Sequence, residues 1–228
     1  TPGNDAYDAE ICTEFRAGTP DALVPFGLAL GGSDPTRFTD VCGDDPKTCL
    51  SVAADMWQRL QAINEAAYDR TEACSFTTFI AYEWSGTKNL SNLHRNVIFK
   101  NDRVPDLPIS HYEAPSEYEL WRQLERHCLD DGSGCDVLSI PHNTNWSNGN
   151  MFVPDYPLKG SEKKQAKRRA RVEPLIEIFQ HKGDSECQDG VSGILGPPDE
   201  LCGFEKLRQP GFEDCGDEVG SQGMVGRG

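Results

Sequence analysis

The feature that most constrains this fold is the alternation of apolar, strand-like runs with amphipathic helical segments in the middle of the chain. Apolar residues recur at three- and four-residue spacing from Leu50 to Ala67, which predicts a helix. Ser116 and Glu119 form a capping box that opens a second helix. Helices are predicted over 48–70, 117–128 and 161–170, and strands over 76–84, 93–100, 136–142 and 173–180. Because several strands are near-continuous apolar runs, we expect an α/β architecture with a parallel sheet or barrel.

The two ends of the chain differ from this middle part. Residues 1–46 are rich in Gly, Asp, Thr and Pro, and little regular structure is expected there. After residue 183 the chain returns to Gly, Pro, Asp and Cys. The predicted organisation is therefore a loop-rich entry segment (1–46), an α/β core (47–187) and a loop-rich segment (188–228).

The charge balance excludes some partners. The net charge of -15 would repel nucleic-acid phosphates. No apolar run approaches the roughly 18 residues that span a bilayer. A local basic run has two interpretations, a solvated helix face or a rim that attracts an anionic substrate. It consists of Lys163, Lys164, Lys167, Arg168, Arg169 and Arg171.

Nine cysteines are many for a cytosolic protein of this size, and no C-x-x-C pair suggests structural zinc. Three pairs enclose short loops or excursions rich in Gly, Asp, Pro or Ser: Cys42/Cys49, Cys128/Cys135 and Cys187/Cys202. Disulfides form in oxidising compartments, so a periplasmic or extracellular location is expected. The ninth cysteine is free or pairs outside this sequence.

Potential metal ligands lie at the ends of the predicted strands. Glu83 ends the first strand, His94 opens the second, and His142 ends the third. Carboxylate and imidazole donors that converge from separate elements are what a divalent metal requires. Each residue also has an ordinary interpretation: Glu83 as a cap or ion-pair partner, and the histidines as hydrogen-bonded turn residues.

The other candidate residues are less specific. Arg95, next to His94, would suit a phosphate or sulfate clamp, or it forms an ion pair with a surplus carboxylate. His111 and His127 are interpreted as structural or surface residues. No G-x-S-x-G elbow and no Gly-rich phosphate loop occurs.

Four stretches together resemble a known family: "FTTFIAYEWSG", "NLHRNVIF", "SIPHNTNWSNGNMF" and "RRARVEPLIEIFQHKGDSEC". They are similar to domain-of-unknown-function family 3604, which is related to the polymerase and histidinol phosphatase (PHP) superfamily. The resemblance covers about residues 76–187. It implies part of a distorted (β/α)7 barrel with long disulfide-clipped loops, two or three zinc, manganese or iron ions, and phosphoester hydrolysis.

The resemblance also implies roles for individual residues. Glu83 resembles the carboxylate that bridges two metals, and His94 and His142 resemble metal-ligating histidines. The implied substrate-binding residues are Asn143, Asn145 and Asn148, which would line the pocket, and Gln180 and Lys182 of a family signature.

The sequence departs from the superfamily pattern, because its His-x-His and Asp-x-His motifs are absent. We therefore expect an internal fragment whose fold is completed by other segments or copies of the chain. The expected function is hydrolysis of a small anionic ester, such as a phosphoester, by metal-activated water, with Glu83, His142 and Arg95 as catalytic residues. The alternatives are a catalytically silent, disulfide-stapled binding or assembly protein, and calcium or carbohydrate binding by the Asn/Asp-rich loops.

Overall fold

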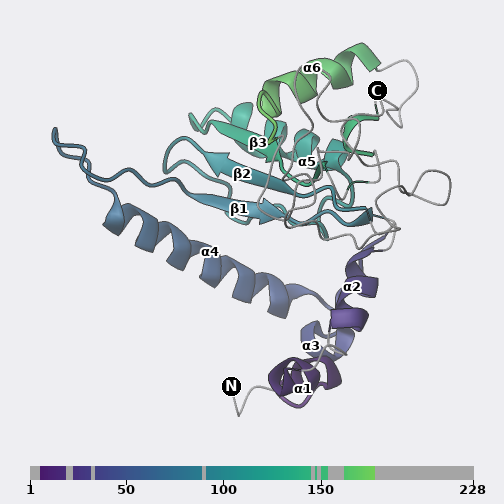
Figure 1. The fold of residues 1–228 in the computed structure, drawn as a ribbon. Helices are drawn as coiled ribbons and strands as arrows, with labels where there is room; N and C mark the ends of the chain where they lie inside the picture. The colour runs from purple at the N-terminus through teal and green to yellow at the C-terminus, as the bar shows by residue number, and fades with distance from the viewer. Residues whose placement is uncertain are drawn as a thin grey trace, which may run out of the picture.

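The computed structural model describes residues 6–18, 23–31, 34–88, 91–144, 147, 150–153 and 162–177. Figure 1 shows the strands lying between helix α6 and the long helix α4. The helices are α1 (Glu10–Ala17), α2 (Leu23–Gly31), α3 (Thr39–Cys42), α4 (Lys47–Ala67), α5 (Glu117–Leu124) and α6 (Glu162–Val172). The strands are β1 (Ala81–Trp84), β2 (Arg95–Phe99) and β3 (Val137–Pro141). A π-helical turn, Glu125–Leu129, continues α5, and a 3-10 turn spans Asn150–Phe152.

Within the described part of the chain, the strands form an open, three-stranded sheet in the order β1-β2-β3, and both pairs are antiparallel. The class therefore mixes helices with a sheet, but the prediction of a parallel sheet is wrong for these strands. Only residues 85–94 join β1 to β2, whereas a parallel crossover needs about a dozen residues or more. The apolar runs were misleading because one face of β2 and of β3 is deeply buried and the other face is still half-covered.

Most predicted elements of the core are confirmed within a few residues. The Ser116 hydroxyl accepts a hydrogen bond from the Glu119 backbone N–H at 3.3 Å, as the capping box predicts. The fourth predicted strand differs. Its described part, 173–177, is not paired as a strand, although the Glu177 N–H donates to the Pro141 carbonyl at 3.0 Å. The remainder, 178–180, lies outside the described residues.

The expectation of little regular structure over 1–46 is wrong, because this segment contains α1, α2 and α3. These helices have only 8, 9 and 4 residues, too few to show a clear helical period. Helix α1 ends at Gly18, which has φ 68 and caps the helix in the left-handed conformation. The predicted domain boundaries remain a prediction.

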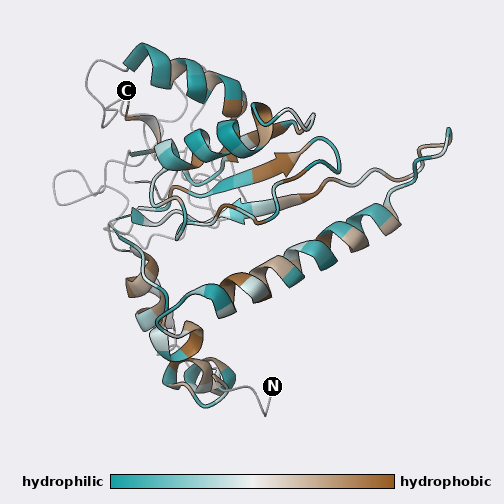
Figure 2. Cartoon of the chain, turned by 180° about the vertical axis from the view of Figure 1, so that it is seen from behind, coloured by the Kyte–Doolittle hydropathy of each residue, from teal (hydrophilic) through white to brown (hydrophobic). Residues whose placement is uncertain are grey.

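The core lies between the buried face of the sheet and helices α5 and α6. In Figure 2 part of the sheet is coloured as apolar, whereas α6 is largely hydrophilic. Trp57 of α4 completes this core, and its indole N–H donates to the Pro105 carbonyl at 2.8 Å. The large buried side chains are Trp57, Trp84, Val97, Phe99, Leu120, Trp121, Leu124, Val137 and Val172.

A buried ion pair crosses this core. The side chains of Arg95 and Glu173 are only 1% and 2% exposed, and Arg95 Nε lies 2.9 Å from Glu173 Oε1. The same carboxylate accepts hydrogen bonds from the Trp121 indole at 2.8 Å and from Arg169 at 3.1 Å. The pair therefore joins β2 to α5 and to the end of α6.

We predict that Glu173→Gln lowers the free energy of unfolding by about 3–5 kcal/mol, because it leaves the Arg95 charge buried without an anionic partner. Urea denaturation followed by circular dichroism measures the change. The matched control is Asp136→Asn, which removes an exposed ion pair. In this pair the Lys100 side chain is 75% exposed and the Asp136 side chain is 50% exposed. The control should cost no more than about 1 kcal/mol. Equal losses in both variants would contradict the prediction.

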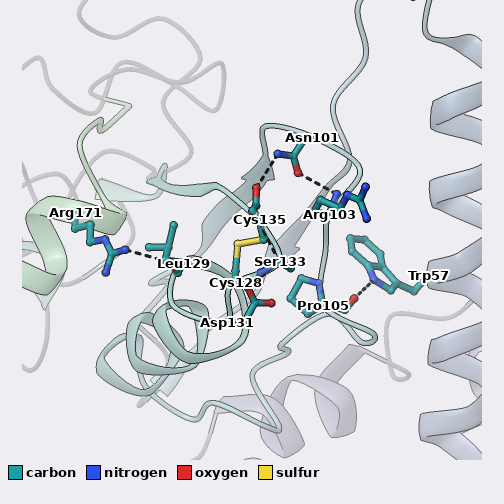
Figure 3. Close-up of a disulfide and its surroundings, with 11 residues drawn as sticks. Trp57, Asn101, Arg103, Pro105, Cys128, Leu129, Asp131, Ser133, Cys135 and Arg171 are labelled. Carbon is teal, nitrogen blue, oxygen red and sulfur yellow. Dashed lines mark hydrogen bonds between the residues drawn. A yellow bond between two sulfur atoms is a disulfide. The ribbon is translucent and has the colours of Figure 1, made fainter.

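Two disulfides confirm the predicted pairs Cys42–Cys49 and Cys128–Cys135. Figure 3 shows that Cys128–Cys135 closes the turn between the π-helical segment and β3. Inside this turn the Asp131 carboxylate accepts hydrogen bonds from the N–H and hydroxyl of Ser133. The predicted pair Cys187/Cys202 lies beyond the part of the chain that the structure describes.

The disulfides are compatible with an extracellular or periplasmic location, where such bonds persist. Within the described residues, none of the helices combines the length and the apolar character that a bilayer crossing requires.

The double variant Cys128→Ala/Cys135→Ala should lower the free energy of unfolding by about 2.5 kcal/mol, since it releases a loop closed at a sequence separation of 7. Denaturation midpoints under non-reducing conditions provide the measurement. Cys74→Ala is the control, because Cys74 is exposed and free, and its midpoint should not move. An unchanged midpoint in the double variant would show that the disulfide does not stabilise the fold.

Candidate metal site

The antiparallel sheet brings the three predicted ligands to one edge. β1 and β3 run in one direction and β2 runs in the other, so the ends of β1 and β3 lie beside the start of β2. Glu83 is near the end of β1, His142 follows β3, and His94 precedes β2. In a parallel sheet, a residue at the start of β2 would lie at the edge opposite Glu83 and His142. In this antiparallel sheet, His94 lies at the same edge as the other two.

The three side chains also share a face of the sheet. Glu83 pairs with Asn96 in the register, and strand alternation places His94 and Asn96 on the same face. The His142 backbone N–H lies 3.4 Å from the His94 carbonyl and continues the β2–β3 ladder. The site is therefore built on backbone pairing rather than on loops.

The ligand atoms are close together. One atom from each of Glu83, His94 and His142 lies within 4.8 Å of the others. Glu83 Oε1 is 2.7 Å from His94 Nδ1 and 3.7 Å from His142 Nε2. The two imidazole rings have centroids 6.2 Å apart. These separations suit one small cation surrounded by the three donors.

The charge state of Glu83 favours a cation. Hydrogen bonds from His142 and His94 hold the pKa of the Glu83 carboxyl well below its usual range. The carboxylate is 44% exposed, whereas the His94 and His142 side chains are 20% and 13% exposed. The site thus has an ionised carboxylate that is open to solvent, with two half-buried imidazoles behind it.

The His142 ring is oriented by the backbone. Its Nδ1 lies 3.4 Å from the Ile140 carbonyl, which can only accept a hydrogen bond. A neutral ring that donates from Nδ1 to this carbonyl would present its Nε2 lone pair to a metal bound beside Glu83. Hydrogen bonds of this kind fix the ring orientation of metal-ligating histidines.

The turn after β1 is held by tight packing. The buried Trp84 donates its indole N–H to the Ala114 carbonyl at 3.0 Å. A Cβ at Gly86 would lie 2.1 Å from the Trp84 ring, so only glycine fits there. The Leu93 N–H then donates to the Gly86 carbonyl at 2.7 Å and closes the turn toward His94.

Arg95 is not part of this constellation. Consecutive strand residues point to opposite faces, so Arg95 enters the core while His94 faces the site. Its ion pair with Glu173 corresponds to the second interpretation given for it, and its buried guanidinium is not accessible to a substrate. The arginines of the basic run are likewise paired: Arg168 with Glu125, Arg169 with Glu173, and Arg171 with Asp130.

The predicted substrate-binding residues are only partly described. Asn143 is 1% exposed, and its Oδ1 has no hydrogen-bond partner in the described part of the chain. Asn145, Asn148, Gln180 and Lys182 lie outside the described residues. Two polar residues near the site, Asn96 and Thr87, were not predicted. Asn96 could have been found from its two-residue spacing to His94, whereas nothing in the sequence pointed to Thr87.

The donor set fits a divalent transition metal. Three protein ligands, two imidazoles and one carboxylate, with a fourth position left for water, are typical of catalytic zinc sites. Structural zinc sites are instead closed by four protein ligands. A carboxylate that is nearly half exposed corresponds to the open type.

The chain matches a family model described as protein of unknown function (DUF3604) over residues 29–224. The chain belongs to this family. Neither a curated protein nor a solved structure matches it. The DUF3604 match includes Glu83, His94 and His142, but its description gives no activity, so a function must be argued from the site itself.

We predict that Gly86→Ala in this DUF3604 protein weakens metal binding and lowers stability by more than about 1 kcal/mol, because the added methyl group overlaps the buried Trp84 ring. Thermal unfolding and zinc titration measure the two effects. Gly27→Ala is the control, since nothing lies within 4 Å of its Cβ position in α2. The control should be neutral or stabilising by up to about 1 kcal/mol. Wild-type behaviour of Gly86→Ala would contradict the packing argument.

Proposed function

We propose that this protein is a metal-dependent hydrolase of a small anionic ester, with a phosphoester as the first candidate. The observation that carries the proposal is the convergence of Glu83, His94 and His142, at the ends of three paired strands, to within 4.8 Å. The chemistry that a divalent ion supplies at such a site is the generation of hydroxide from water near neutral pH and the polarisation of an ester oxygen.

The residues of the chain have distinct roles in this proposal. Glu83 provides the negative charge, and it stays ionised because its pKa is held low by His142 and His94. The two histidines provide neutral nitrogen donors. The solvent-facing side of Glu83 leaves room for water and substrate, since this side chain is the most exposed of the three.

The phosphoester class is supported by the resemblance to the PHP superfamily. The three ligands are enough for one ion. A second ion, as PHP sites carry, would need donors that we propose come from other segments or copies of the chain. Lys163, Lys164 and Lys167 of α6 are exposed and would attract an anionic substrate. Because the two disulfides of the described residues would persist in an oxidising compartment, we propose that the enzyme is periplasmic or extracellular.

We predict that Glu83→Gln and His142→Ala each abolish stoichiometric binding of zinc or manganese and hydrolysis of bis(p-nitrophenyl) phosphate. Losing a direct ligand should cost more than the roughly 10–100-fold that changes around the ligands cost. Metal content by mass spectrometry and initial rates after metal loading are the measurements.

The matched controls are Glu65→Gln and His127→Ala. Glu65 pairs with Arg70, and His127 is exposed on the π-helical turn. Both should retain wild-type metal content. If the wild-type protein binds no transition metal, or if the Glu83 and His142 variants keep full activity, the hydrolase proposal is rejected. Metal binding without hydrolysis of any ester would favour a binding protein.

A further inference from the structure

Thr87 stands next to the candidate metal site without being one of its ligands. We propose that Thr87 is a positioning residue that selects which nitrogen of His94 binds the metal. The inference rests on the proposed metal site and extends it, because it assigns His94 Nδ1 as the ligand atom and gives Nε2 to a protein hydrogen bond. It is carried by two contacts of one hydroxyl group.

The Thr87 hydroxyl has a single hydrogen. It donates this hydrogen to the Ser85 carbonyl at 3.1 Å, and a carbonyl oxygen can only accept. The same hydroxyl oxygen lies 3.3 Å from His94 Nε2. When the hydroxyl hydrogen points to Ser85, the hydroxyl oxygen is free to accept a hydrogen from His94 Nε2.

The other nitrogen of His94 is thereby left for the metal. Nδ1 is the atom that faces Glu83, at 2.7 Å from Oε1. Without a metal, Nδ1 donates to the Glu83 carboxylate; a bound metal would take the place of that hydrogen, and the hydrogen of the neutral ring would then be on Nε2, which faces Thr87. His142 has the opposite arrangement, because its Nδ1 faces the Ile140 carbonyl and its Nε2 faces Glu83. The two histidines would therefore bind through different ring nitrogens.

The local fold keeps Thr87 in this place. Gly86 packs against the buried Trp84, and its carbonyl accepts the Leu93 N–H at 2.7 Å. Thr87 thus lies beside Nε2 of the His94 ring, whereas Glu83 lies beside Nδ1. Thr87 is half-buried, so its hydrogen bonds are partly protected from competition by water.

The inference is tested with three variants of the full chain. Thr87→Val keeps the shape of the side chain but removes the hydroxyl, whereas Thr87→Ser keeps the hydroxyl. Thr78→Val is the matched control: Thr78 is also half-buried, but its hydroxyl bonds to Asn64, away from the site. Zinc affinity is measured by titration calorimetry, and thermal unfolding establishes that each variant is folded.

We expect Thr87→Val to bind zinc about 10–100-fold more weakly, which is the usual cost of removing a partner of a ligating histidine. Thr87→Ser and Thr78→Val should bind zinc as the wild type does. In the zinc-loaded wild type, long-range proton–nitrogen correlation spectra should show the hydrogen of His94 on Nε2. Thr87→Val should weaken or lose this single-tautomer signature.

Two results would overturn the role of Thr87 alone: unchanged zinc affinity in Thr87→Val, or a spectrum that places zinc on His94 Nε2. In both cases Glu83-dependent zinc binding by the wild type would still support the metal site. If the wild type does not bind zinc, or if Glu83→Gln binds it equally well, the proposed function fails and the role of Thr87 fails with it.

Discussion

The buried pair of Arg95 and Glu173 is the interaction on which the rest of this structure depends. An unpaired charge in such a position would be very costly, so each group requires the other. The Glu173 carboxylate also accepts hydrogen bonds from the Trp121 indole and from Arg169, and thereby fixes α5 and the end of α6 against β2. Because Arg95 and every second residue after it in β2 face the core, the alternate residues of β2 face the other side of the sheet. His94 directly precedes Arg95, so burial of Arg95 in the core turns His94, and the ligands beside it, to the opposite face of the sheet.

Local features of the sequence predicted much of the fold. Helical spacing gave α4, a capping box gave the start of α5, and two short cysteine spacings gave both described disulfides. Strand direction was not predictable in the same way, because an apolar run has the same pattern in a parallel and an antiparallel sheet. The short link between β1 and β2 was the informative signal. The first helices were missed because each is too short to show a period.

In the candidate site, too, some residues could be predicted from local sequence and others could not. The residue types and their places at strand ends identified Glu83, His94 and His142, and the structure brings all three together. Arg95 was a candidate for the opposite reason, its nearness in sequence to His94, yet neighbours in a strand face opposite sides. Thr87 could not have been identified from sequence, because its proposed role depends on the positions of the Ser85 carbonyl and of His94 Nε2 around one hydroxyl group. Hydrogen-bond direction exists only in three dimensions.

The antiparallel pairing of β1 and β2 also has a consequence for the order of assembly. Glu83, Thr87 and His94 all belong to one hairpin, whereas His142 directly follows β3, which comes much later in the chain. Hairpins form in roughly 1–10 μs, because their contacts require little loop closure. Two of the ligands and the threonine beside them therefore make contacts with one another that are short-range in sequence. His142 joins the other two ligands only when β3 pairs with β2. Metal binding by all three ligands therefore requires that the complete sheet has formed.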